Sequence, residues 1–300
     1  MALTAPLVWL DGKVVPVARA GVPLMAHAVQ RGSLVFDVAA WHVTPRGRAL
    51  FRVDAHVERL LHSASIVGIE LPYDHDALKQ AAIDVINANA PKTDGLVRWS
   101  VFFAAGEPDL LPRNKAAHVA VAAQTLQDAP RSRPLRIATF PDARKAPPEV
   151  LDPTVKAAAA YLGPMIAKRR AVAAGADDVV LLDGEGNIAE APIANVFVVR
   201  NEILSTPPLG TVLPGITRRS VLEIARNLGI ATREEPISRA DFQGAAEAFL
   251  TGTSLPLAPI GVIDGLPLSA KTPVTSRLAD ALRSVRRDTH EGYASWVTFT

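Results

Sequence analysis

A polar stretch with two prolines, residues 125–134, divides this chain into two halves and constrains its fold. Each half alternates strand-like and helix-like segments, as chains that mix sheets and helices do. At 300 residues the chain exceeds one compact core, so two domains are expected. We predict an α/β (α+β) fold with a small N-terminal domain over residues 1–124, a connector over 125–134 and a large C-terminal domain over 135–300.

Local signals place several elements. Asp11-Gly12 between two apolar runs predicts a β-hairpin over residues 8–15. Asp54 precedes apolar residues at helical spacing, so we expect it to cap a helix there. An alanine-rich segment predicts a second-half helix over residues 156–174, which Lys156 opens.

Composition removes several classes of function. The chain has no cysteine, which excludes disulfides and thiolate metal sites, and its seven histidines lack metal-ligand spacing, so we expect no metal; His56 and His62 are interpreted as surface residues. A net charge of +2 is too balanced to indicate nucleic acid. No segment approaches the roughly 18 apolar residues of a membrane helix, and the first residues do not resemble a signal peptide. A soluble, cytoplasmic protein is expected.

Lys156 has the surroundings that best suit a nucleophilic amine. It stands beside small apolar residues at a predicted helix start, where desolvation and the helix dipole favour the neutral amine. A lysine must be neutral to form a Schiff base. Taken alone, the same residue also fits a surface lysine at a helix start.

Glu190 is a candidate partner for a ring nitrogen, because it ends a predicted strand after apolar sequence. Arg59 lies off the apolar stripe of its helix and becomes a phosphate ligand only if a second domain covers that side. Read alone, the first also fits an exposed loop glutamate and the second a solvated arginine.

Two segments are candidate anion sites. Ile216 and Thr217 open a predicted helix, whose first-turn N–H groups and hydroxyl favour an anion. Residues 251–254 place three hydroxyls beside a glycine, with Thr253 and Ser254 among them. A simple threonine cap and an ordinary turn remain the alternatives.

An amine, a carboxylate and a phosphate cradle together are what a pyridoxal-phosphate (PLP) enzyme requires. No competing chemistry has comparable support, since the sequence contains no His-Glu-x-x-His, no Gly-x-Ser-x-Gly and no P-loop.

The order of these motifs resembles the class IV, fold-type IV PLP enzymes, and most closely the bacterial branched-chain aminotransferases. Lys156 is followed by Tyr161, and a step of 34 residues leads to Glu190. The resemblance runs from residue 9 to about residue 265, and its segments are residues 9–12, 27–36, 51–64, 156–162, 190–197, 213–218 and 251–253.

The resemblance implies a role for each matching residue. Lys156 forms the Schiff base and moves a proton between the substrate Cα and C4′ of the cofactor, and Glu190 pairs with the pyridine nitrogen. Tyr161 hydrogen-bonds the phenolic oxygen, and Phe36 walls the substrate pocket. The implied phosphate ligands are Arg59, Ile216, Thr217 and Thr253, while Asn195 completes the cofactor site. The family also implies a two-domain PLP-binding fold and a homodimer.

The departures from the family concern the substrate. Branched-chain enzymes carry Glu-Gly after the pocket phenylalanine, whereas this chain has Asp37-Val38, and Val38 is similar to the (R)-amine transaminases. Two family tyrosines that hold the substrate carboxylate are replaced by Arg31 and Leu96, while Arg98 is kept. We hypothesise that Arg31, Arg98 or both bind that carboxylate; pairing with a nearby acid is the alternative. Ser254 is a further candidate substrate ligand.

The first functional interpretation is transamination between a branched-chain or other small apolar amino acid and a 2-oxo acid such as 2-oxoglutarate. A D-amino acid or (R)-amine transaminase follows closely because of the altered pocket. Aminodeoxychorismate lyase, which shares the lysine and the glutamate, is a second class, and a non-catalytic PLP-binding relative is a third.

Overall fold

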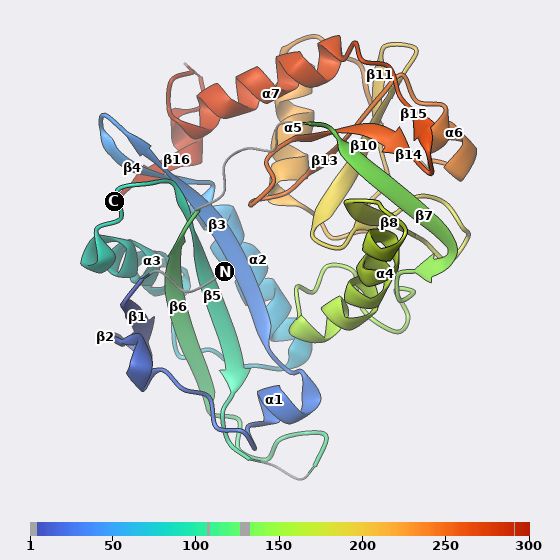
Figure 1. Ribbon diagram of the computed structural model, residues 1–300. Helices are drawn as coiled ribbons and strands as arrows, with labels where there is room; N and C mark the ends of the chain where they lie inside the picture. Colours follow the sequence, from blue (N-terminus) through green and yellow to red (C-terminus); the bar gives the residue numbers. More distant parts are fainter. Residues whose placement is uncertain (1–4, 107–108, 127–132, 291) are drawn as a thin grey trace. The chain divides into compact units, whose positions relative to one another are not determined.

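The computed structural model describes residues 5–106, 109–126, 133–290 and 292–300 (Figure 1). It divides into two compact units: unit 1 comprises Met1–Asp128, Val155–Ala159 and Ser284–Thr300, and unit 2 comprises Ala129–Thr154 and Ala160–Arg283. Both units mix helices with sheet, which confirms the expected fold class.

The units differ from the predicted domains at two segments. Residues 155–159 and 284–300 were expected in the C-terminal domain, but both belong to unit 1. Backbone pairing explains the difference, because Ala157 bridges to Val35 and residues 297–299 pair with a strand of unit 1. Residues 127–132 of the expected connector lie outside the described residues.

Unit 1 is built on a seven-stranded antiparallel sheet in the order β16-β4-β3-β5-β6-β1-β2. The predicted hairpin is confirmed, since β1 pairs with β2 around Asp11 and Gly12, whose φ angles of 46° and 92° suit a tight turn. The strands are β1 (Leu7–Leu10), β2 (Lys13–Pro16), β3 (Val35–Thr44), β4 (Gly47–Phe51), β5 (Gly95–Phe103), β6 (Ala117–Thr125) and β16 (Val297–Phe299).

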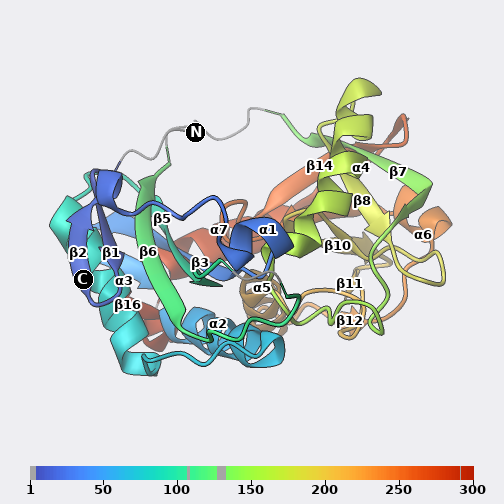
Figure 2. The same ribbon diagram turned by 90° about the horizontal axis from the view of Figure 1, so that it is seen from below.

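Helices α2 (Val53–Val67) and α3 (His75–Asn89) cover one face of this sheet (Figures 1 and 2). The core beneath them contains Trp41 and Trp99, whose indole N–H groups donate to backbone carbonyls at 3.0 and 2.9 Å. The prediction that Asp54 caps α2 is wrong: the helix begins at Val53, and Asp54 lies in its first turn. Unit 1 also contains η1 (Val17–Arg19), α1 (His27–Arg31) and η3 (Ala294–Trp296).

Unit 2 is built on a nine-stranded mixed sheet in the order β12-β11-β10-β13-β14-β7-β8, with β9 beside β10 and β15 beside β14. The pairs β11–β12, β14–β7 and β7–β8 are parallel. The strands are β7 (Leu135–Arg144), β8 (Asp178–Leu182), β9 (Glu190–Ala191), β10 (Ala194–Arg200), β11 (Ile203–Thr206), β12 (Thr232–Glu234), β13 (Glu247–Thr251), β14 (Ala258–Ile263) and β15 (Leu266–Pro267).

The helix predicted over residues 156–174 begins later than expected. Lys156 lies in an extended segment, because its carbonyl accepts from Phe36 N at 3.0 Å and Ala158 N donates to Leu34 O at 2.8 Å. Lys156 therefore does not open a helix, and the prediction that a helix dipole acts on its amine is wrong. The remaining helices are η2 (Ala158–Tyr161), α4 (Leu162–Ala173), α5 (Ile216–Asn227), α6 (Arg239–Gln243) and α7 (Pro273–Arg286).

Within the described ranges, no helix has the length and apolar character that crossing a membrane needs.

Gly95 provides a test of the packing of unit 1. A Cβ at this position overlaps the Trp41 ring and lies 2.5 Å from the Gln124 carbonyl, so Gly95→Ala overpacks the core. We expect a loss of about 1–3 kcal/mol in the free energy of unfolding, measured with urea. Gly21→Ala is the matched control, because a Cβ at Gly21 meets nothing within 4 Å. Equal stability of the two variants would contradict this packing.

Candidate active site

Glu190 is the centre of a polar assembly in unit 2. Its side chain is 14% exposed, and its Oε2 accepts from Asn195 Nδ2 at 3.2 Å and from Leu213 N at 3.1 Å. The Lys145 ammonium pairs with Oε1. The carboxylate is therefore fixed in orientation by neighbours on three different segments.

Asn195 joins this carboxylate to the start of α5. Strand β10 pairs Asn195 with Glu190 on β9 and with Thr251 on β13. Its Nδ2 also donates to Leu213 O at 3.0 Å. A Cβ at Gly215 would overlap Asn195 Oδ1, so only glycine permits this close approach.

The first turn of α5 supplies anion-binding groups beside that junction. Gly215 is the N-cap of α5, followed by Ile216 and the buried Thr217, and the first N–H groups of a helix have no acceptor within it. Gly252, next to Thr253, is also constrained, because a Cβ there lies 2.9 Å from the Ile193 carbonyl. The predicted phosphate segments thus flank the predicted carboxylate.

Lys156 is held in unit 1 by its backbone. Its N–H donates to Ser63 Oγ on α2 at 3.0 Å, and its carbonyl accepts from Phe36 N on β3 at 3.0 Å. Its Nζ lies 4.9 Å from the centre of the Phe36 ring. The amine therefore lies against an aromatic wall, with a main chain tied to both helix and sheet.

Arg98 stands on the same face of the sheet. It pairs with Val38 across β3 and β5, and its guanidinium carbon lies 3.7 Å above the Phe36 ring. Phe36, Val38 and Arg98 are at alternate positions of neighbouring strands, so they share one face. This face combines an apolar wall with a cation, next to Lys156.

A buried charge network lies on the other face of the sheet of unit 1. Asp37 accepts from Arg59 Nε at 2.7 Å, from Arg59 Nη2 at 2.9 Å and from His56 Nδ1 at 2.7 Å. Burial by itself raises the pKa of Asp37, but the Arg59 charge and the His56 hydrogen bond outweigh it and leave the pKa well below the ordinary value. Burial lowers the pKa of His56, against the effect of Asp37.

Sequence reasoning missed this network. His56 is buried, so its interpretation as a surface residue is wrong. Asp37 was noted only as a departure from the family pattern, although it anchors Arg59. The available signal was the spacing of His56 and Arg59, three residues apart on one helix, which places both side chains on the same side.

The predicted site residues thus form two sets. Unit 1 contains Arg31, Phe36, Val38, Arg59, Arg98 and Lys156, and unit 2 contains Tyr161, Glu190, Asn195, Ile216, Thr217, Thr253 and Ser254. Arg31 is exposed and its Nη1 donates to the Gln30 carbonyl at 3.2 Å, while Ser254 is also exposed. Tyr161 is partly buried at the end of η2.

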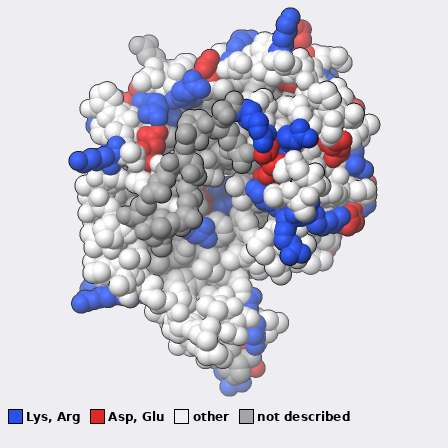
Figure 3. Space-filling model, in the orientation of Figure 1, with Lys and Arg blue, Asp and Glu red and all other residues white. Residues whose placement is uncertain are grey.

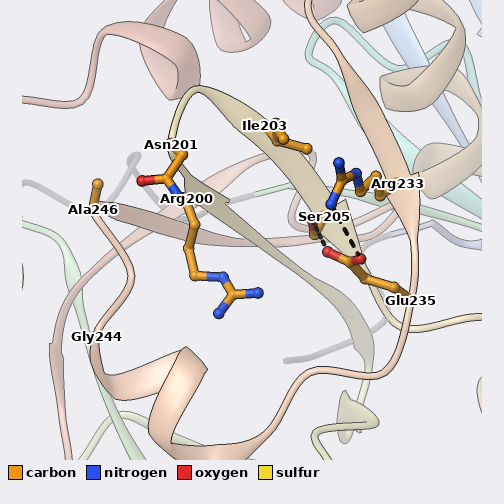
Figure 4. Close-up of a pocket in the computed structure, with 8 residues that line it drawn as sticks. All are labelled: Arg200, Asn201, Ile203, Ser205, Arg233, Glu235, Gly244 and Ala246. Carbon is orange, nitrogen blue, oxygen red and sulfur yellow. Dashed lines mark hydrogen bonds and ion pairs between the residues drawn. The ribbon is translucent and has the colours of Figure 1, made fainter.

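A pocket of about 300 Å³ lies in unit 2 at the end of β10 opposite to Asn195 (Figure 4). Ser205 donates to Glu235 at 2.7 Å, and Arg233 approaches the same carboxylate at 3.9 Å. Arg200 pairs with Asp241. Each cation of this pocket already has a carboxylate partner, so the pocket presents no uncompensated charge to a ligand.

On the face of unit 2 that Figure 3 shows, acidic and basic side chains are interspersed, so neither charge forms a separate patch there. Among the described residues no group of three or more His, Asp or Glu side chains is arranged to hold a metal ion.

The residues of unit 2 fit PLP on their own chemistry. Glu190 has an oriented carboxylate that suits a ring N–H, and the first-turn N–H groups of α5 are donors that suit a phosphate. These features define a PLP-dependent enzyme, and comparison with known proteins specifies the class.

The family described as "Amino-transferase class IV" matches residues 34–263. The branched-chain-amino-acid aminotransferase of Pseudomonas aeruginosa is 30% identical over 298 residues, covering 97% of this chain and 96% of that protein. The crystal structure of a branched-chain aminotransferase from Thermoproteus uzoniensis with norvaline matches with a TM-score of 0.94 and 33% identity, over 98% of this chain and 99% of that one. The branched-chain amino acid aminotransferase of Thermobaculum terrenum, in its PLP form, matches with a TM-score of 0.91 and 26% identity, over 99% of both chains.

The chain belongs to the class IV aminotransferase family. It is a PLP-dependent enzyme of transamination, as the motifs predicted.

Gly215 tests the junction between Asn195 and α5. Gly215→Ala displaces the Asn195 amide from Glu190, so we expect PLP affinity of the apoenzyme to fall by about tenfold. Gly163→Ala is the control, since a Cβ at Gly163 meets nothing within 4 Å. PLP titration followed by fluorescence measures both; an unchanged affinity in Gly215→Ala would show that the glycine is dispensable.

Asp37 tests the buried network. Asp37→Asn leaves Arg59 without its charge partner and is expected to lower the free energy of unfolding at pH 7 by about 3–5 kcal/mol. The folded-state pKa of Asp37 lies below its ordinary value of 3.8, so its contribution is complete above that pH and is lost as the pH falls further.

Urea unfolding between pH 7 and pH 3 measures this difference. The control is Asp76→Asn, whose side chain is 96% exposed and which should change little. The difference in the free energy of unfolding between wild type and Asp37→Asn should shrink as the pH falls. A difference that grows instead would contradict a lowered pKa of Asp37 in this network.

Proposed function

We propose that this enzyme transfers the amino group between a branched-chain or other small apolar amino acid and a 2-oxo acid such as 2-oxoglutarate. The face made by Phe36, Val38 and Arg98 beside Lys156 carries this proposal. An aromatic and aliphatic wall suits an apolar side chain, and a guanidinium suits a carboxylate. The relatives with branched-chain names, one of them determined with norvaline, support the same substrate class.

Bound PLP supplies an electron-accepting ring that stabilises negative charge at the substrate Cα. Lys156 would hold the cofactor through its amine, and the same amine would move a proton between the substrate Cα and C4′ of the cofactor. Glu190 holds the proton on the ring nitrogen, and Tyr161 hydrogen-bonds the phenolic oxygen. Asn195 keeps the Glu190 carboxylate oriented.

The proposed phosphate ligands are of two chemical kinds. Arg59, fixed by Asp37, provides a charged ligand. The α5 N-terminus provides backbone N–H groups at Ile216, together with hydroxyls of Thr217 and Thr253.

Arg98 is the better placed of the two candidate carboxylate ligands. Its guanidinium lies over Phe36, which is also the ring that Lys156 approaches, whereas Arg31 is exposed and bonded to its own helix. We assign Arg98 to the substrate carboxylate and keep Arg31 and Ser254 as secondary candidates.

A homodimer is part of the proposal. Unit 1 exposes Leu24, Met25 and Val29 near Leu110 and Leu111, and His27 Nε2 lies 3.0 Å from the Leu110 carbonyl, which joins these loops. An exposed apolar cluster of this kind favours a protein interface. Light scattering on the eluting protein tests it, and a monomer at micromolar concentration contradicts it.

A cytoplasmic location accords with a chain that needs no disulfide, and cell fractionation tests it.

The decisive assay is a half-reaction screen of the holoenzyme with L-amino acids, D-amino acids and (R)-amines, followed by absorbance. We expect the L-branched-chain amino acids to react fastest. Preference for D-amino acids or (R)-amines would instead support the alternative that Val38 suggested. Pyruvate release from aminodeoxychorismate without an acceptor would support the lyase alternative, which the names of the relatives do not favour.

Arg98 gives a specific prediction. Arg98→Ala should raise KM for an amino acid by about tenfold or more, because a charge-assisted bond to the substrate carboxylate is lost. The half-reaction with an amine that has no carboxylate should change little. Arg31→Ala, at the secondary candidate, should raise KM less than Arg98→Ala does. Unchanged KM in both variants would remove arginine from carboxylate binding.

A further inference from the structure

Lys145 is the one charged residue that contacts Glu190 among the residues that the structure describes. It follows β7 directly, and its backbone N–H donates to Leu182 O at 2.8 Å, which fixes it against β8. The side chains of Lys145 and Glu190 are 17% and 14% exposed, so the pair is largely removed from water. No motif of the sequence pointed to this lysine.

The two oxygens of Glu190 have different partners. Oε2 accepts from two neutral groups, Asn195 Nδ2 and Leu213 N, which orient the carboxylate. Oε1 is bound by the Lys145 ammonium. A ring N–H that approaches Glu190 must therefore share the carboxylate with a cation that is already present.

We propose that Lys145 is a positioning residue that sets how strongly Glu190 holds the proton on the cofactor's ring nitrogen. This inference rests on the proposed role of Glu190. The ammonium cancels part of the carboxylate charge at close range in a site of low exposure, where such interactions are least screened. The ring proton consequently feels a weaker attraction than an unaccompanied carboxylate would give.

The direction of the effect follows from the contacts. Removing the charge of Lys145 leaves the orientation of Glu190 in place, because Asn195 and Leu213 still donate to Oε2. It also leaves a mostly buried carboxylate without a counter-charge, which is unfavourable until another cation arrives. A protonated ring nitrogen is such a cation, so it is held more tightly without Lys145.

The test compares PLP with its 1-deaza analogue, whose ring has carbon in place of nitrogen. The affinities of full-length apoenzyme for both are measured in wild type and in Lys145→Met, Lys145→Gln and Lys145→Arg. The ratio of the two affinities isolates the ring nitrogen, because a general loosening of the site weakens both ligands alike. Lys168→Met is the matched control, since it breaks another lysine–carboxylate pair of unit 2, at 2.8 Å from Asp178.

We expect the preference for PLP over the analogue to rise by about tenfold in Lys145→Met and Lys145→Gln, the change expected from removing one nearby opposite charge. Lys145→Arg and Lys168→Met should keep the wild-type ratio. An unchanged or reduced ratio in both neutral variants overturns the proposal, as does loss of both ligands in both variants, which would assign the lysine to folding.

If the proposed role of Glu190 itself is wrong, the affinity ratios change in a different pattern. If Glu190 does not face the ring nitrogen, Glu190→Gln leaves the wild-type ratio unchanged. A ratio that falls in Glu190→Gln but does not rise in the Lys145 variants retains the role of Glu190 and rejects only that of Lys145.

Discussion

The site of unit 2 depends on one hydrogen-bonded junction, in which Asn195 and Leu213 N fix the Glu190 carboxylate. Asn195 lies on β10 between β9 and β13, so the sheet sets its position. Gly215 allows the amide to approach the start of α5, and this brings the carboxylate and the helix N-terminus into one structure. Strand pairing therefore determines where the proposed ring-binding acid and the proposed phosphate-binding turn lie.

Unit 1 places cationic side chains next to an apolar wall. Its sheet separates two groups of charged residues by the alternation of strand side chains. Asp37 points into the core and holds Arg59 and His56, while the adjacent Phe36 faces the side of Lys156. Successive positions of β3 therefore point to opposite faces of the sheet, where Asp37 anchors an arginine and Phe36 forms a wall of the proposed pocket.

Much of this arrangement was predictable because it is encoded in short segments. The hairpin at Asp11-Gly12, the two mixed units and the family followed from turn chemistry and ordered motifs. The helix start at Lys156 was not predictable, because pairing with β3 outweighs the helix propensity of the alanines. The ion pairs Asp37–Arg59 and Lys145–Glu190 were not predicted either, because their members lie 22 and 45 positions apart in the sequence and only folding brings them together.

The proposed chemistry depends most on Lys156 as the point of cofactor attachment. Borohydride reduction of the holoenzyme followed by tryptic mapping tests this directly, because a modified Lys156 resists cleavage and leaves residues 146–168 as one peptide. We expect the phosphopyridoxyl group on that peptide. A reduced adduct on Lys145, the lysine beside Glu190, or on any other residue would contradict it.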